Sequence, residues 1–167
     1  MSMKIAYPNN NSDQFIDIEI KYVRQVFFSV HENLISKEEE KAVFVGMSAN
    51  IGNALDRDML NFKLKSWYHY EDIEEKLAVI EVENIFVIKD LKRYKGEGKE
   101  IDFPARVWVT IVSLAISHTR ALLTHNLGST ELQHVIIPLL NPEKIARDFY
   151  PKSFDTSEQR QLVSGDE

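Results

Sequence analysis

Side chains that could bind a metal are scattered along this sequence. The five histidines stand at 31, 69, 118, 125 and 134, and no two have the three- or four-residue spacing that puts two ligands on one face of a helix. His118 lies on the apolar side of a helical pattern, which is typical of a hydrogen-bonded histidine in a core or an interface. We therefore predict no metal site.

Nucleophiles and phosphate-binding loops are equally hard to find. The absence of cysteine excludes thiol nucleophiles, disulfides and zinc–thiolate sites. The stretch KGEGK at 95–99 lacks the spacing of a phosphate-binding loop, and no Ser or Thr follows Lys99. We predict no catalytic residues, no enzymatic activity and no cofactor. A small hydrolase with carboxylate chemistry remains the enzymatic alternative.

Charge and hydropathy restrict the kinds of partner that this protein can have. The 167 residues carry a net charge of −6 without a dense Lys/Arg cluster, which argues against nucleic acid. The longest apolar stretch, within 107–123, is interrupted by Ser, Thr, His and Arg, so we predict no membrane insertion. The first residues lack the apolar run of a signal peptide. We expect a cytoplasmic protein.

Four consecutive stretches have the period-two alternation of half-buried strands: 14–30, 42–53, 59–71 and 77–91. Short connections between them predict an antiparallel sheet. Within the first stretch the alternation slips by one residue near Gln25, which indicates a bulge. One apolar face of this sheet must be covered.

A long helix is predicted over 103–126, ended by Gly128, and a short helix runs to about Phe149 behind Pro142. The predicted fold is therefore α+β: a four-stranded antiparallel sheet, a long helix and a short C-terminal helix. We expect a flexible N-terminal arm over 1–13, one domain over 14–150 and a disordered tail over 151–167.

The long helix combines a polar stripe with an apolar arc wider than one sheet face needs. The surplus suggests contact with another subunit, although a simple buried core helix would also fit. The stripe, as the predicted oligomer interface, is formed by Arg106, Thr110, Ser113, Ser117 and Arg120.

Aromatic residues occupy both faces at the end of the third predicted strand. Trp67 and His69 alternate with Tyr68 and Tyr70. One face can bury its rings in the core, whereas the other is wet or meets a partner. Ordinary cross-strand packing of the rings is the alternative.

Three stretches together resemble the SecB-like chaperone family. They are IEVENIFVIKDL (80–91), FPARVWVTIVSLAISHTRALL (103–123) and GSTELQHVIIPLLNPEKI (128–145). The third stretch resembles the family's Gly-Thr-like turn and its Pro-x-x-Asn segment before the last helix. The residues that carry this likeness are Gly128, Ser129, Thr130, Leu132, Pro138 and Asn141.

The resemblance implies a homotetramer, a dimer of dimers, that holds unfolded or nascent chains in hydrophobic grooves without ATP, with protein export as one role. Relatives contact an export motor, the translocase, through acidic residues on the outer sheet face. Asp17 and Glu19 occupy a comparable place, although two isolated carboxylates are also typical of a solvated strand face.

The predicted peptide-binding residues are apolar and lie at the bend of the first strand, in the connection after it and in the Pro-flanked segment. They are Phe27, Phe28, Val30, Leu34, Ile35, Ile136, Ile137, Leu139 and Leu140. Two other binding roles remain open: a chaperone dedicated to one client, such as that of a toxin–antitoxin pair, and a non-enzymatic assembly adaptor.

Overall fold

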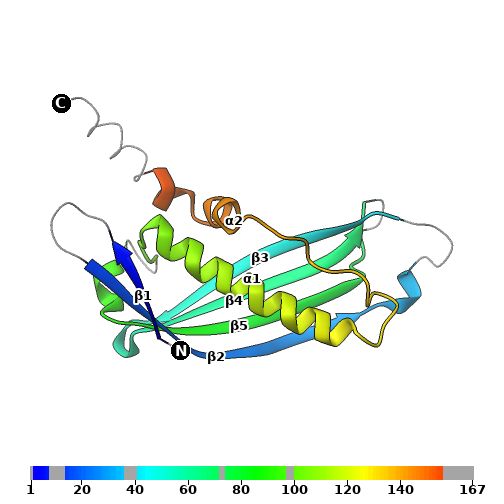
Figure 1. Ribbon diagram of the computed structural model, residues 1–167, viewed down its shortest axis with the longest axis horizontal. Coiled ribbons are helices and arrows are strands. Elements are labelled where there is room, and N and C mark those ends of the chain that lie inside the picture. Colours follow the sequence, from blue (N-terminus) through cyan, green and yellow to red (C-terminus); the bar gives the residue numbers. More distant parts are fainter. Residues whose placement is uncertain (1, 8–13, 36–40, 72–73, 97–99, 156–167) are drawn as a thin grey trace.

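One long helix lies along a twisted antiparallel sheet in the computed structural model (Figure 1). The structure describes residues 2–7, 14–35, 41–71, 74–96 and 100–155. The elements are β1 (Ser2–Tyr7), β2 (Gln14–Val30), β3 (Val43–Ala54), β4 (Met59–Tyr70), β5 (Ala78–Ile88), α1 (Ala105–Leu127) and α2 (Pro142–Phe149). The sequence-based prediction of an α+β fold is therefore confirmed.

All four predicted strands are present, in the order β2-β5-β4-β3. A fifth strand, β1, pairs antiparallel with the start of β2, Ser2 opposite Glu19 and Tyr7 opposite Gln14. The prediction of a flexible arm is thus wrong for Ser2–Tyr7, while residues 8–13 lie outside the described part. The sequence SMKIAY is short and its alternation weak, so cross-strand pairing rather than local pattern defines this strand.

The register of β2 shifts twice against β5, between Ile20 and Tyr22 and between Gln25 and Phe27. The predicted bulge near Gln25 is confirmed. The earlier shift moves Tyr22 to the opposite face from Ile18. Phe28 and Val30 consequently point toward α1, whereas Phe27 points to the face of the sheet that no helix covers, which we call the open face.

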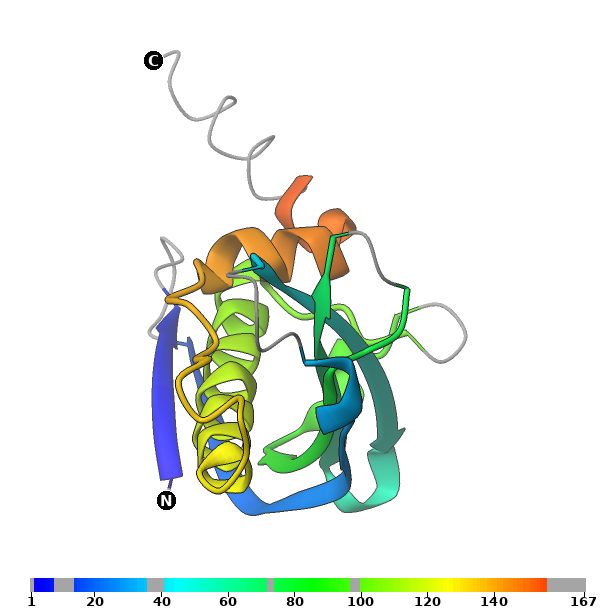
Figure 2. The same cartoon turned by 90° about the vertical axis from the view of Figure 1, so that its right-hand side faces the viewer.

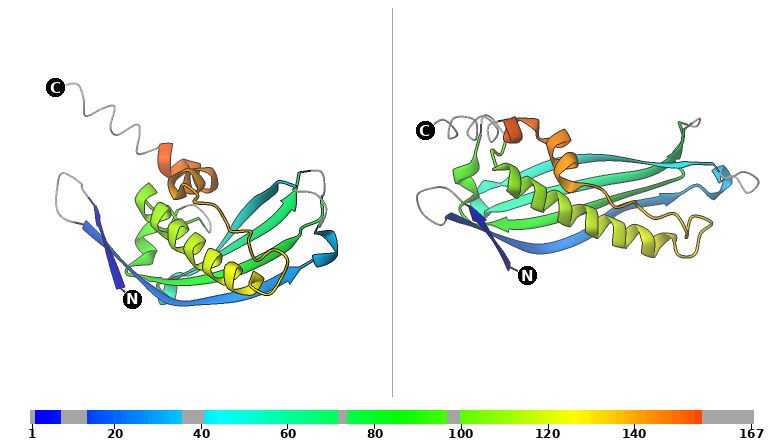
Figure 3. Two further views of the ribbon diagram at one scale, coloured as in Figure 1. Left: turned by 45° about the vertical axis from the view of Figure 1, so that its right-hand side comes forward. Right: turned by 45° about the horizontal axis from the view of Figure 1, so that its top comes forward.

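α1 packs in the trough formed by the curved sheet (Figure 2, Figure 3). Its buried residues meet a strictly alternating β4, in which Leu60, Phe62 and Leu64 have no exposed surface. α2 and the segment between the two helices complete the core, so part of the wide apolar arc of α1 is covered by this same chain.

Among the described residues, α1 is the one helix whose length and composition would suffice to cross a membrane. Its buried side chains, however, include Trp108, Ile111 and Leu123, which pack in the core of the domain. The hydropathy of α1 is therefore that of a core helix.

The chain continues past α2 in a further helical stretch, 151–155, in which Phe154 is 3% exposed. Arg147 of α2 lies 4.9 Å over the Phe154 ring. The predicted disordered tail is therefore wrong for 151–155, and residues 156–167 lie outside the described part. The sequence did not predict this helical turn, because Phe154 is a single aromatic residue in a stretch without apolar periodicity.

A polar pair links α1 to the middle of β5. His118 Nδ1 lies 2.7 Å from Asn84 Oδ1, and the amide of the fully buried Asn84 donates to the Phe62 carbonyl at 3.4 Å. Because the Asn84 oxygen must accept, Nδ1 of His118 carries the proton. The hydrogen-bonded core histidine predicted from the sequence is confirmed, and burial lowers its pKa below 6.5.

This lowered pKa predicts a pH-dependent stability. The unfolded chain binds a proton at His118 more readily than the folded chain does, so stability is complete above pH 6.5 and falls as pH drops below it. Urea unfolding between about pH 7.5 and about pH 5.5 should show this slope, and His118→Gln should reduce it. Both proteins contain the other four histidines, so the contribution of these residues to the slope cancels in the comparison. Equal slopes in both proteins would contradict the assignment of the lowered pKa to His118.

On the open face Trp67 lies across Gly46 of the neighbouring strand. A Cβ built at Gly46 would stand 2.2 Å from Trp67 Cε2, and Lys76 Nζ covers the same ring at 4.3 Å. Glycine is therefore required at position 46 for the ring to lie flat on the sheet.

Gly46→Ala should displace Trp67 and lower the free energy of unfolding by roughly 1–3 kcal/mol, because overpacking forces the ring off its site. Gly52→Ala is the matched control on the same strand, since its Cβ would meet Asn61 Cβ at 3.7 Å, an ordinary contact. Denaturant unfolding followed by tryptophan fluorescence measures both. Equal stability of the two variants would contradict the assigned contact.

Candidate polypeptide-binding site

The segment 132–140 runs back over the sheet from α1 toward α2 with part of its apolar side chains turned outward. Leu132 and Ile137 are buried, and Tyr68 of β4 donates its hydroxyl to the Val135 carbonyl at 3.2 Å. Burial of that hydroxyl raises the pKa of Tyr68 to about 12, so it stays protonated as a donor. The segment is thus fixed to the sheet at three points.

Ile136 lies between these anchors and is 53% exposed, and Leu139, two residues after Ile137, is 89% exposed. Six large apolar side chains among the described residues are exposed, and these two are the most exposed of them. Because the segment is anchored on both sides, holding these side chains in water costs little additional conformational entropy. Both residues were predicted as binding residues, and the structure places them on the surface.

Half-buried apolar residues lie along the same edge of the core. Phe28, Val30, Leu34 and Ile35 pack against the cluster formed by Tyr68, Leu123 and Ile137 without being fully covered. Leu140 contacts this cluster and also the one beneath α2. The structure therefore brings these five predicted residues to one apolar region.

Two of the predicted binding residues lie elsewhere. Ile137 is 1% exposed and belongs to the core, where it packs in the cluster with Tyr68 and Leu123. Phe27 is 48% exposed, but on the open face, together with Tyr22. The sequence placed Phe27 beside Phe28, and the period of a strand separates them by the thickness of the sheet.

A pocket of about 720 Å³ opens at the other end of the apolar edge. Trp108 stacks on Tyr150 with ring centroids 3.9 Å apart, and its Nε1 donates to Ser153 Oγ at 3.1 Å. The walls come from β3, α1, residues 96 and 100–102, and the chain from the end of α2 onward. The lining residues are Ile51, Gly96, Glu100, Ile101, Asp102, Trp108, Phe149, Tyr150, Pro151, Lys152 and Ser153.

The pocket is apolar inside and acidic at its rim. Glu100 pairs with Lys152 across 3.4 Å, and both side chains are largely exposed. Asp102 adds a second carboxylate. Two acids against one lysine leave the rim negative, which favours a basic neighbour beside any apolar group that enters.

Sequence reasoning missed this pocket for two reasons. Trp108 fitted the core face of a predicted helix, and Tyr150 to Ser153 stood at the start of a predicted tail. The usable signal was the aromatic pair Phe149–Tyr150 followed by proline, because two adjacent rings at a helix end are seldom both solvated. Asn141 holds α2 in place by accepting from the amides of Glu143 and Lys144.

A second buried polar group lies on the open face. Glu83, 4% exposed, accepts from Asn61 at 2.8 Å and Arg24 at 2.6 Å on the open face. Burial would raise its pKa, but the hydrogen bonds from Asn61 and Arg24 and the charges of Arg24 and Lys63 hold it below its usual value. The described residues contain no group of three His, Cys, Asp or Glu arranged to hold a metal ion.

The remaining predicted residues are placed on two surfaces. Asp17 and Glu19 alternate with the buried Ile16 and Ile18, so both carboxylates lie on the open face near the start of β2.

The polar stripe lies on the side of α1 away from the sheet, where Arg106 and Ser117 are exposed. Two of its hydroxyls bond within the helix: Thr110 to the Arg106 carbonyl at 3.0 Å and Ser117 to the Ser113 carbonyl at 2.9 Å. Arg120 is partly exposed, and its positive charge lowers the pKa of Tyr68, although burial of the tyrosine hydroxyl outweighs this effect.

Comparison with known proteins adds a structural likeness. No family model and no curated protein matches the sequence. Among solved structures, the SecB-like chaperone Rv1957 of Mycobacterium tuberculosis, in complex with a ChAD peptide from the HigA1 antitoxin Rv1956, aligns with a TM-score of 0.47 at 11% identity. The alignment covers 74% of this chain and 90% of that one. A likeness of this size leaves function to be argued from this chain's own surface.

Proposed function

We propose that this protein is an ATP-independent holding chaperone that binds unfolded or nascent polypeptide segments. The observation that carries the proposal is the anchored segment 132–140, which holds Ile136 and Leu139 in solvent beside a half-covered apolar edge. Apolar side chains fixed outward in this way are typical of binding surfaces.

The expected affinity is low for each contact. Full burial of a Leu or Ile side chain contributes about 1.5–3 kcal/mol, and association costs offset much of the sum of two or three such contacts. One surface therefore binds at roughly micromolar strength, and several copies in an oligomer would retain a long client by multivalency. A net charge of −6 keeps such an apolar surface from self-association by mutual repulsion.

Two finer features belong to the same proposal. We infer that the chain assembles as a dimer of dimers through the polar stripe of α1, whose small residues permit close approach of a second helix. Asp17 and Glu19 on the open face are the proposed contact with a translocase motor, in an export role in the cytoplasm. A client-dedicated chaperone would differ from a general one by binding one unfolded protein among many.

The binding surface is tested by placing charge on it. The double variant Ile136→Asp, Leu139→Asp should abolish suppression of aggregation of a reduced, unfolded test protein. Its unfolding free energy should change by less than about 0.5 kcal/mol, because both side chains are exposed. Light scattering of the test protein with and without the chaperone measures the effect.

The matched control is Gln133→Asp, His134→Asp, which adds the same charge to two exposed polar residues of the same segment. This control should retain holding activity. Full activity in the Ile136/Leu139 variant would refute the proposed site, and a wild-type protein that never slows aggregation would refute the function.

The oligomer interface is tested at Ser117. Ser117→Arg should reduce the mass of the assembly measured by light scattering, since a long charged side chain would separate two helices in close contact. Ser117→Ala keeps the small volume and should leave the mass unchanged. An unchanged mass for Ser117→Arg, with normal circular dichroism, would place the interface elsewhere.

A further inference from the structure

The two long edges of the sheet differ in how they are protected against pairing with another chain. The outer edge of β2 is covered by β1 along Gln14–Glu19. Beyond that point it carries Lys21 and Arg24 and two register shifts. A covering strand, charged residues and bulges all prevent a foreign strand from adding to an edge.

The opposite edge, β3, has none of these features. Its 12 residues, VFVGMSANIGNA, include no charged residue and no proline. Its register with β4 is continuous from Val43 to Ala54, without a bulge. Within the described part of the chain, β3 pairs with β4 alone, so its other side is a long, straight and neutral template for a further strand.

Side-chain contacts show which backbone groups of β3 point outward. Ser66 of β4 donates its hydroxyl to the Gly46 carbonyl at 3.3 Å, so that carbonyl points toward β4. Backbone groups alternate along an antiparallel ladder. Gly46 and Ser48 therefore bond to β4, and Val45, Met47 and Ala49 direct their N–H and C=O groups away from the sheet.

The backbone groups of β4, the next strand of the sheet, alternate in the same way. Asn84 of β5 reaches the carbonyl of Phe62, its partner on β4, which places that carbonyl between β4 and β5. The residues of β4 that bond to β3 are then Trp67 and Lys65, opposite Gly46 and Ser48. Two independent contacts thus agree on which residues of β3 and β4 form hydrogen bonds with each other.

We propose that an extended segment of the client polypeptide adds to β3 as a sixth strand. This inference rests on the proposed function and names how the client is held. Backbone hydrogen bonding does not depend on the client's sequence, which suits a protein that recognises unfolded chains.

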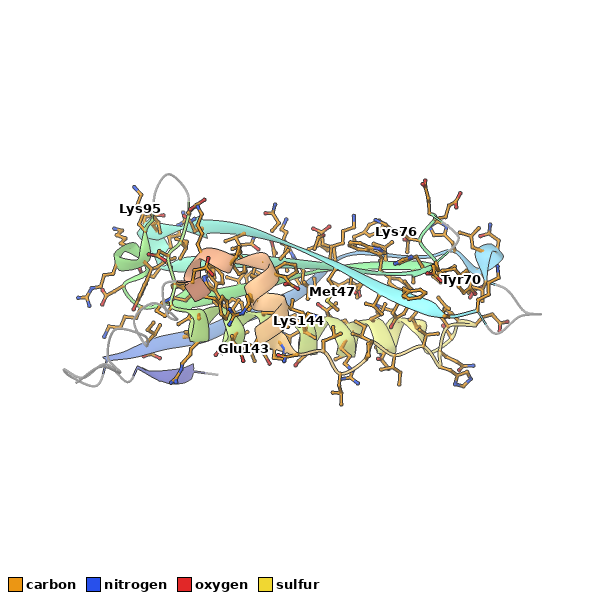
Figure 4. The ribbon with its side chains drawn as sticks, turned by 90° about the horizontal axis from the view of Figure 1, so that it is seen from above. Met47, Tyr70, Lys76, Lys95, Glu143 and Lys144 are labelled. Carbon is orange, nitrogen blue, oxygen red and sulfur yellow. The ribbon has the colours of Figure 1, made fainter. Side chains whose placement is uncertain are left out.

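The β3 edge is continuous with the candidate binding site. Met47 packs with both core clusters beside Leu140, and Ile51 lines the aromatic pocket. Met47 lies near the middle of the long axis when the molecule is viewed from above (Figure 4). A client strand on β3 would therefore pass alternate side chains over Met47 and deliver one apolar side chain to the pocket. The acidic rim at Glu100 and Asp102 favours a Lys or Arg beside that anchor.

Amide hydrogen exchange tests the proposal on the full chain. The probe is a synthetic 12-residue peptide, as long as β3, that alternates Val or Leu with Thr or Lys. Saturating peptide should slow exchange at Val45, Met47 and Ala49 by about tenfold or more, while Gly46 and Ser48 stay unchanged because β4 already protects them.

Peptide backbone chemistry supplies the matched control. N-methylation of one alternate set of peptide residues should weaken binding by about tenfold or more, since several hydrogen bonds are lost. N-methylation of the other set should leave affinity nearly unchanged. Ala49→Pro removes one outward N–H of an edge strand and should also weaken binding, whereas Ala49→Ser retains that N–H and should not.

The possible outcomes distinguish strand addition from the proposed holding function on which it rests. Peptide binding with unchanged exchange along β3, or equal effects of both methylation patterns, would overturn strand addition and leave the holding function standing. Slow exchange at Val45, Met47 and Ala49 in the peptide-free oligomer would assign the edge to a second copy and overturn the inference. A chain that binds neither the peptide nor an unfolded protein would overturn both.

Discussion

A single helix cannot cover a sheet of this width, and the rest of the structure follows from that mismatch. α1 with its side chains is about 10–12 Å across, while four strands spaced about 4.8 Å apart span more than that. α1 therefore protects the centre of the trough, over β4 and β5, and the flanks need other material. The segment 132–140 and α2 provide it on the β3 side, but as an extended chain and two turns of helix they close the core incompletely.

Incomplete closure produces the candidate binding surface. Burial of Leu132 and Ile137 leaves Gln133, His134 and Ile136 between them exposed. The aromatic pocket arises in the same way, where α2 ends and the chain turns back toward β3 with Tyr150 stacked on Trp108. Two buried polar groups are paired within the domain: Asn84 with His118 on the covered face, and Glu83 with Arg24 on the open face. Exposed apolar side chains remain at Ile136 and Leu139 in the segment 132–140, and at Tyr22 and Phe27 on the open face.

Much of this architecture could be predicted from the sequence because the strands alternate cleanly and α1 has a strong helical period. The strand β4 shows why: every second residue from Leu60 to Tyr70 is buried, so pattern and structure coincide. β1 escaped prediction because its strand character comes from pairing with β2. Phe27 was grouped with Phe28 as a binding residue, but the two lie on opposite faces of the sheet, and the pocket was missed because its walls come from four separate parts of the chain. Long-range packing of this kind leaves no local periodicity.

The central claim is that unfolded polypeptide binds to the apolar side formed by β3, 132–140 and the aromatic pocket. The most direct measurement is a titration of methyl-labelled protein with a reduced, unfolded client, followed by methyl NMR. The account predicts shifts for Met47, Ile51, Ile136 and Leu139, with none for Ile18 or Leu60 in the closed core. Shifts confined to the open face around Ile85 and Met59, or no shifts at all at a client concentration that suppresses its own aggregation, would contradict it.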